Sequence, residues 1–365
     1  MSARIGLPNI DIVFTQKAVT AVQRSERGVL AVIMKDSKAG SGVKKTVLRR
    51  STDLTTDMFD TANYNDLKRA FNVAVNKIYV FTATDFTDLT AISKELEKVR
   101  YNYVCTNIKG QQDKLVQYVT TFNAQSKGHK VVAVVANPTT ADNKYIIKMK
   151  GAGGTLTDDT EVTCESYTVR VASTLANLPM NRSLTYYVFE ELKDWDDTYI
   201  EDGKDIEYWI DNGWLTLIND DEEVKCGRAV NSLKTFTSTD TEDMSYIIIV
   251  EAMNMILEDI YTTFKDYYVG KYKNSYDNQK LFLSSVNTYF RQLASEEILE
   301  PNYYNHCEID VETQRNAWTA VGKEEALDWD DNTVKNMPFR TFVYVAGDVH
   351  IMNAIEDLKF TIAMA

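Results

Sequence analysis

The segment from Lys77 to Ala136 constrains the fold most strongly, because two kinds of apolar pattern alternate along it. Short apolar runs, typical of buried strands, are separated by stretches in which apolar residues recur every three or four positions, as on one face of a helix. Strands that alternate with helices over short links form a parallel sheet covered by helices. The sequence therefore predicts an α/β domain, with strands at 78–83, 103–105 and 131–136 and helices at 89–99 and 115–122.

The C-terminal half has a different pattern. Apolar residues step by three and four positions from Ile249 to Tyr267, and again from Leu281 to Leu293, so each stretch predicts an amphipathic helix. Gly270 is placed to end the first of these helices. The other predicted elements are a strand at 28–34, an exposed loop or small hairpin at 35–56, a strand at 145–147, a helix at 167–175, strands at 185–189 and 342–345, and a turn at 347–348.

These patterns predict a parallel-sheet α/β core domain followed by an α+β C-terminal domain, with an extended β-strand arm at each end. The chain of 365 residues is long enough for two or three domains with a large core. The expected divisions are an N-terminal strand arm at 1–22, a small N-terminal α/β segment at 23–76, the core domain at 77–225, the C-terminal domain at 226–350 and a C-terminal strand arm at 351–365.

Both ends of the chain alternate apolar and polar residues, as strands do. Chain ends are usually polar and frayed unless something holds them. A strand at a free end can pair within its own fold, or it can join the sheet edge of another molecule. Pairing between the ends of neighbouring copies would give a linked polymer. The residues that share the apolar face of these arms are Ile10, Ile12 and Phe14 at the front, and Leu358, Phe360, Ile362 and Met364 at the back.

Charge and composition exclude several classes of partner. The formal net charge of −13 argues against a general nucleic-acid binder, which normally carries a basic face. The first residues lack the apolar run of a signal peptide, and no stretch reaches the ~18 apolar residues of a membrane span. Four cysteines without a CxxC pair are expected to be reduced and packed in cores. We therefore expect a cytoplasmic protein that neither binds nucleic acid nor inserts into a membrane.

No pattern of residues predicts an active site, a metal or a cofactor. The turn after the first core strand has no glycine and carries Asp85 and Asp88, which would repel the phosphates of a dinucleotide. Adjacent His306 and Cys307 would point to opposite faces of a strand, so they are not expected to form a catalytic pair. We interpret the acidic stretch at 194–202, which lacks EF-hand spacing, as a solvated loop. The alternative for that stretch is a carboxylate- or metal-dependent hydrolase.

Five short stretches in the second half of the chain occur in a familiar order and spacing. They read N-R-S-L-T-Y at 181–186, D-N-G-W-L-T-L at 211–217, R-A-V-N-S-L-K-T at 228–235, D-I, F, Y-V-G-K and N within 259–274, and Y-F-R-Q-L at 289–293. With them the chain resembles the contractile tail sheath proteins of long-tailed phages and R-type tailocins, in the short form found in Gram-positive systems. The family-signature positions are Asn181, Ser183, Leu184, Arg228, Asn231, Leu233, Tyr268, Gly270 and Lys271.

The sequence departs from this family pattern in two places. Lys234 stands where threonine is usual, and residues 247–251 replace a basic stretch at the start of the long helix, so no basic contact is inferred there. The large outer insertion domain of bigger sheath proteins also has little room between residues 35 and 76.

The resemblance implies a structural, non-enzymatic protein without cofactors. Copies would stack as hexameric rings around an inner tail tube protein, each donating its terminal strands to neighbours, with baseplate and tail terminator proteins as further partners. Assembly would take place in the bacterial cytoplasm, before release in a phage tail or tailocin. The resemblance leaves a type VI-like contractile system open as an alternative. We expect flexible links at 17–27 and 314–336, and a contact with the tube at 351–357.

Overall fold

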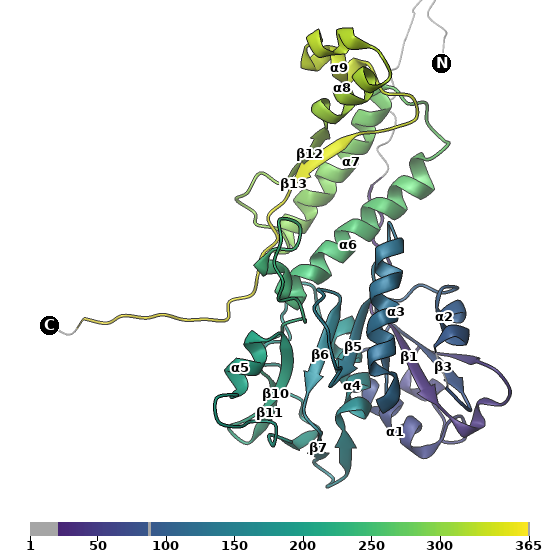
Figure 1. Cartoon of the computed structure of the whole chain (residues 1–365), viewed down its shortest axis with the longest axis vertical. Coiled ribbons are helices and arrows are strands. Elements are labelled where there is room, and N and C mark those ends of the chain that lie inside the picture. Colours follow the sequence, from purple (N-terminus) through teal and green to yellow (C-terminus); the bar gives the residue numbers. More distant parts are fainter. Residues whose placement is uncertain (1–20, 87–88, 364–365) are drawn as a thin grey trace, which may run out of the picture.

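An eight-stranded sheet, with parallel strands at its centre and one antiparallel strand at each edge, forms the larger part of the molecule (Figure 1). The structure is a computed structural model, and it describes residues 21–86 and 89–363. In spatial order the strands are β11 (Glu223–Cys226), β10 (Trp214–Asp220), β6 (Ile146–Lys150), β5 (Val132–Ala136), β4 (Tyr103–Thr106), β1 (Val29–Lys35), β3 (Lys77–Ala83) and β2 (Lys44–Leu48). The predicted α/β segment at 77–136 is confirmed as β3, β4 and β5 with two intervening helices.

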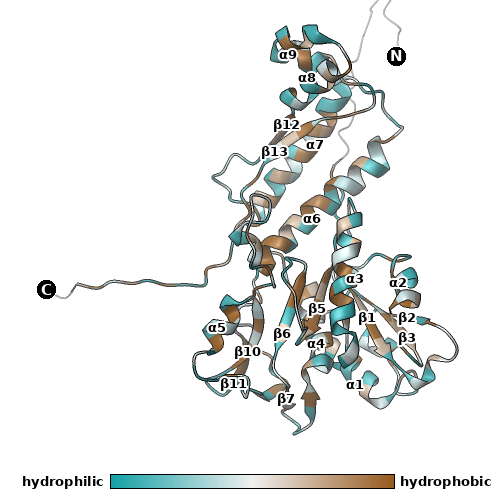
Figure 2. Ribbon diagram, in the orientation of Figure 1, coloured by the Kyte–Doolittle hydropathy of each residue, from teal (hydrophilic) through white to brown (hydrophobic). Residues whose placement is uncertain are grey.

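Helices cover both faces of this sheet. On β1, Leu30 and Val32 pack into one apolar core, whereas Ala31 and Ile33 pack into the other. Because both faces are buried, the strand reads as one continuous apolar run, which appears brown in Figure 2. The first core contains α1 (Thr61–Ala70) and α4 (Cys164–Asn177), and the second contains α2 (Thr90–Leu96) and α3 (Gln112–Gln125).

Several smaller elements flank the large sheet. The helix α5 (Ile206–Asp211) lies beside β10, where the side chains of Trp209 and Trp214 enclose the ammonium of Lys150. A three-stranded antiparallel sheet completes this part of the molecule, with the order β8 (Glu161–Thr163), β7 (Gly153–Leu156) and β9 (Leu192–Trp195).

The C-terminal part is helical and carries one small sheet. Its helices are α6 (Ile247–Thr263), α7 (Tyr276–Ser295), α8 (Val311–Ala320) and α9 (Asp331–Asn336), and its strands are β12 (His306–Ile309) and β13 (Val345–Asp348). The apolar faces of α6 and α7 pack together into a third core, as their periodicity predicts. Side chains that accept from backbone N–H groups begin three of these helices, namely Ser275, Asp310 and Asp330. Gly270 adopts a φ of 74° just after the helical turn that extends α6.

The large sheet includes strands from outside the predicted core domain at 77–225. β1 belongs to the predicted segment 23–76, but it pairs with both β3 and β4 and so lies at the centre of the core sheet. β2, from the predicted loop or hairpin at 35–56, pairs with β3. The boundary expected at residue 77 therefore separates strands that one sheet joins, because hydrogen bonding between distant segments sets the order of the strands.

Three local predictions are also wrong. Residues 185–189 form only one isolated bridge, between Val188 and Lys225, because Tyr186 turns the chain with a φ of 56°. The turn expected at 347–348 lies within β13. The flexible link expected at 314–336 is folded into α8 and α9, where buried Gln314 donates to the carbonyl oxygen of Val334 at 2.6 Å.

Candidate assembly surfaces

An extended segment starts near residue 352 and leaves the body of the molecule after residue 357 (Figure 1). Exposure alternates along its first six residues. Met352, Ala354 and Glu356 are partly covered, whereas Asn353, Ile355 and Asp357 are exposed. A period of two is that of an extended chain with one side against a surface. Residues 352–357 therefore lie on the body with every second side chain facing it.

A group of polar side chains holds this segment where it leaves the body. We call this group the arm anchor: Ser183, Thr185, Arg228, Glu356 and Asp357. The Glu356 side chain is only 7% exposed and accepts hydrogen bonds from the hydroxyls of Ser183, at 3.1 Å, and Thr185, at 2.7 Å. Arg228 lies with Nε 3.4 Å from the other oxygen of Glu356 and donates from Nη2 to Asp357 at 2.6 Å. The anchor thus joins two of the family-signature positions to the start of the C-terminal segment.

Beyond the anchor the side chains meet little of the rest of the molecule. Leu358 is 90% exposed, Phe360 75% and Ile362 70%, and the segment pairs with no strand in the part of the chain that the structure describes. Large apolar side chains so exposed mark a surface that another molecule covers. Of the predicted arm positions, Met364 and the N-terminal Ile10, Ile12 and Phe14 lie outside the described residues.

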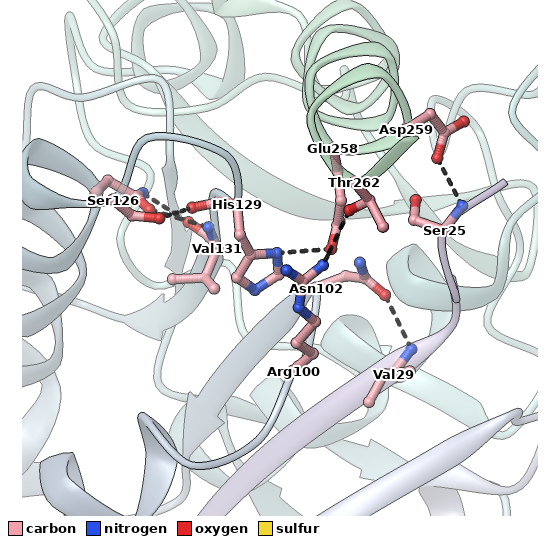
Figure 3. A network of polar contacts seen from close by, with 11 residues as sticks. Ser25, Val29, Arg100, Asn102, Ser126, His129, Val131, Glu258, Asp259 and Thr262 are labelled. Atoms are coloured by element: carbon pink, nitrogen blue, oxygen red, sulfur yellow. Dashed lines mark hydrogen bonds and ion pairs between the residues drawn. The ribbon is translucent and has the colours of Figure 1, made fainter. Parts of the chain in front are cut away.

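The first described residues of the chain lie along α6 and lead directly into β1. The N–H of Gln23 donates to Thr263 Oγ1 at 2.9 Å. The N–H of Ser25 donates to Asp259 Oδ1 at 2.6 Å, as Figure 3 shows. The second oxygen of Asp259, which is fully buried, accepts from the hydroxyl of Tyr289 on α7 at 2.6 Å. Arg27 forms an ion pair with Glu251, also on α6. The predicted flexible link at 17–27 is thus fixed over its described part.

The same helix joins the two parts of the molecule through Glu258. Its side chain, 4% exposed, accepts from Arg100 Nη1 at 2.9 Å and lies 3.0 Å from His129 Nδ1 (Figure 3). Burial alone would raise the pKa of Glu258, but the contact with His129 and the charges of Arg27 and Arg100 outweigh burial and lower it. Next to His129, Gly128 leaves room for the ring of Tyr261, which a Cβ atom would meet at 2.1 Å. The helix α6 is therefore the element that fixes the C-terminal part to the core.

The small sheet of β12 and β13 has one blocked edge and one open edge. On the outer side of β12, the side-chain amide of Asn287 accepts from the N–H of Cys307 at 2.7 Å and donates to its carbonyl oxygen at 2.9 Å. On β13 all four residues are exposed, and its outer edge meets no other strand among residues 21–86 and 89–363. A sheet of two strands is barely stable alone, and an open edge is a template for a further strand.

Most of the other signature positions support the fold. Buried Asn231 donates to the carbonyl oxygen of Met244 at 2.7 Å and accepts from the N–H of Leu233 at 3.0 Å, which fixes the start of the C-terminal part. Leu184, Leu233 and Tyr268 are buried, and Lys271 donates to the carbonyl oxygen of Asp266. Asn181 is exposed. The structure thus brings Ser183 and Arg228 together at one site, and distributes the remaining positions through the fold.

The arrangement offers little chemistry. Within the described residues, no group of three or more potential metal ligands occurs, and no helix is long and apolar enough to cross a membrane. In the acidic stretch at 194–202, Asp196 accepts from the N–H groups of Ala152 and Thr198 and so stabilises local turns. All four cysteines are buried free thiols, as expected, and burial raises the pKa of Cys307 to about 11.

Thr185, Asn287, Glu356 and Asp357 are part of these surfaces, but the sequence did not predict the contacts that they make. Glu356 and Asp357 belong to the stretch 351–357 that we expected to contact the tube, and Thr185 belongs to a predicted strand. The signal that could have found Glu356 is the exposed Ile355 beside it, since an apolar residue within a polar stretch indicates a covered surface.

An exposed apolar terminal segment and an open strand edge are typical of proteins that build assemblies. Comparison with known families agrees. A model of the phage tail sheath protein central domain matches residues 82–232, and a model of the phage tail sheath C-terminal domain matches residues 239–365. The chain therefore belongs to the phage tail sheath protein family.

The chain is also similar to individual proteins of known identity or structure. The tail sheath protein of Clostridium phage phiCD119 is 28% identical over 366 residues, which cover 98% of this chain and 99% of the relative. The sheath tail protein of Desulfitobacterium hafniense has a similar fold, with a TM-score of 0.68 and 14% identity over 83% of this chain and 94% of that one. The anti-feeding prophage sheath in its contracted state gives a TM-score of 0.69 and 11% identity over 98% and 99% of the two chains.

Proposed function

We propose that this sheath protein polymerises as stacked hexameric rings around an inner tail tube, and that the sheath contracts to drive the tube through a target cell envelope. The exposed apolar face of Leu358, Phe360 and Ile362 carries the proposal, because it has no partner within the described part of its own chain and fits a strand donated to another copy. The fold shared with a helical sheath in its contracted state supports the contraction step.

The open edge of β13 is the receiving surface that we propose. Asn287 blocks the outer edge of β12 at Cys307. Along this part of the sheet, a strand from another copy can therefore add only beside β13. Main-chain hydrogen bonds hold such a strand whatever its side chains do, so a linked subunit can rotate as a rigid body while the link persists. The N-terminal arm, with Ile10, Ile12 and Phe14, is proposed to link to a second neighbour in the same way.

No nucleotide or cofactor is needed in this proposal. The extended sheath is a metastable state, and contraction releases free energy stored during assembly as subunits gain contacts with each other. The other partners are the inner tube protein, the baseplate and the tail terminator, and assembly takes place in the bacterial cytoplasm before release. The protein itself acts only through the surfaces that it presents.

Electron microscopy of negatively stained protein, expressed with the rest of its particle, tests the proposal. We expect tubular polymers from the native chain and none from Phe360→Asp, since the new charge lies on the apolar face of the arm. Thr361→Asp adds the same charge to the opposite face and serves as the control that still assembles. A Phe360→Asp protein that forms sheaths of normal length would contradict the proposal, as would a native chain that enters no tubular particle. Ile12→Pro applies the same test to the N-terminal arm.

A further inference from the structure

The alternation of residues 352–357 gives the C-terminal arm a defined orientation at its origin. Glu356 is the last side chain of the segment that the body covers, and three polar side chains contact it. Ile355, directly before it, is fully exposed, and Asp357, directly after it, contacts Arg228 from the outside. Among residues 352–363, Glu356 is thus the last residue whose side chain faces the body.

The contact of Glu356 with the body determines the direction in which each face of the arm points. In an extended chain successive side chains point to opposite faces, so Leu358, Phe360 and Ile362 lie on the same side as Glu356. A shift of one residue would move the whole apolar set to the other face. We propose that Glu356 is a register pin: by holding its own side chain against the body, it sets the face on which the arm presents its apolar residues to the receiving sheet. The proposal rests on the proposed function, in which the arm joins a neighbour.

The charges and contacts fit a positioning role. Burying a carboxylate to 7% exposure costs free energy. The hydrogen bonds from the two hydroxyls and the nearby charge of Arg228 offset part of that cost only when Glu356 points inward. Asp357 contacts the same guanidinium, but its side chain is 78% exposed, and exposed ion pairs contribute little to stability. The two neighbouring acidic residues therefore differ sharply in how far their side chains are buried, and Asp357 provides a matched control for Glu356.

Insertions between Asp357 and Leu358 separate the orientation of the arm from its length. One inserted alanine places the apolar set on the wrong face, whereas two inserted alanines lengthen the arm further but restore the face. We expect the single insertion to abolish tubular polymers and the double insertion to restore them, as seen by electron microscopy of the co-expressed particle. Equal assembly of the two insertion variants, whether both succeed or both fail, would overturn the register pin.

Substitutions test the pin itself. Glu356→Ala should reduce the yield of polymer, whereas Asp357→Ala should leave the yield close to that of the native chain. Thermal unfolding of the purified monomers checks that the body is intact, and it should be unchanged by either insertion, which lies beyond the anchor. If Asp357→Ala impairs assembly as much as Glu356→Ala does, the proposal that Glu356 is a register pin is wrong, and only the negative charge at the arm anchor matters. Failure of the native chain to form tubes would instead refute the proposed function.

Discussion

At the scale of the residue, Glu258 shows how one buried carboxylate can join two parts of a molecule. It belongs to α6, and both of its close partners, Arg100 and His129, belong to the core. Because its pKa is lowered in the folded protein, the carboxylate contributes stability at pH values above its ordinary pKa, and that contribution is lost as the pH falls through the lower pKa of the folded state.

We therefore expect Glu258→Gln to destabilise the protein by about 1–3 kcal/mol at neutral pH, and by less at acidic pH. Denaturant unfolding at pH 7 and at pH 3 to 4 measures both values. Glu296→Gln is the control, because Glu296 also pairs with an arginine but its side chain is 40% exposed, so its loss should cost little. A penalty for Glu258→Gln that stays constant down to pH 3 would show that the lowered pKa does not stabilise the junction.

At the scale of the element, the hydrogen-bond pattern of β12 and β13 shows which groups of β13 face outward. The N–H of Asp310 donates to the carbonyl oxygen of Tyr344 at 3.1 Å, and hydrogen-bonded pairs recur at every second residue of an antiparallel ladder. Glu308 and Ala346 therefore form such a pair. Tyr344 and Ala346 thus face β12, and the N–H of Val345, which lies between these two residues in the chain, faces the open edge.

This pattern separates two proline substitutions that differ by one position. Val345→Pro removes an outward N–H, so we expect it to prevent polymerisation while the thermal unfolding of the monomer stays nearly unchanged. Ala346→Pro instead removes a bond of the existing ladder, and should destabilise the monomer by about 1 kcal/mol or more. Electron microscopy and calorimetry of both variants distinguish the effects. Normal sheaths from Val345→Pro would show that β13 is not the receiving edge.

The elements also show how far the sequence predicts the fold. The strands and helices at 77–136 and the two long helices were predictable, because their apolar patterns are local. The position of β1 between β3 and β4 was not, since it depends on pairing between segments more than 40 residues apart. The strand expected at 185–189 fails because Tyr186 adopts a left-handed conformation that its own pattern does not reveal. Glu356 was missed for a similar reason, because its partners Ser183 and Arg228 are distant in the chain.

At the scale of the whole molecule, the two ends are attached to the body in different ways. The first described residues, 21–28, continue directly into β1, which aligns with seven residues of β3 and four of β4. The C-terminal segment, in contrast, is held near its exit by the few side chains of the arm anchor. A force on either terminal segment therefore reaches the body of the molecule through its attachment.

The central position of β1 has a mechanical consequence. A force applied through the first described residues loads their hydrogen bonds with α6 and then the hydrogen bonds of β1 with both of its neighbours. A force on the C-terminal segment loads only the few contacts of the arm anchor, one after another. Pulling on the two ends of a single molecule should therefore give a first, weak extension as residues 352–357 peel away, followed by a much larger force when the sheet gives way. A molecule whose N-terminal end yields first would contradict this order. If the order holds, tension in a stretched polymer lengthens the C-terminal links and leaves the folded bodies intact.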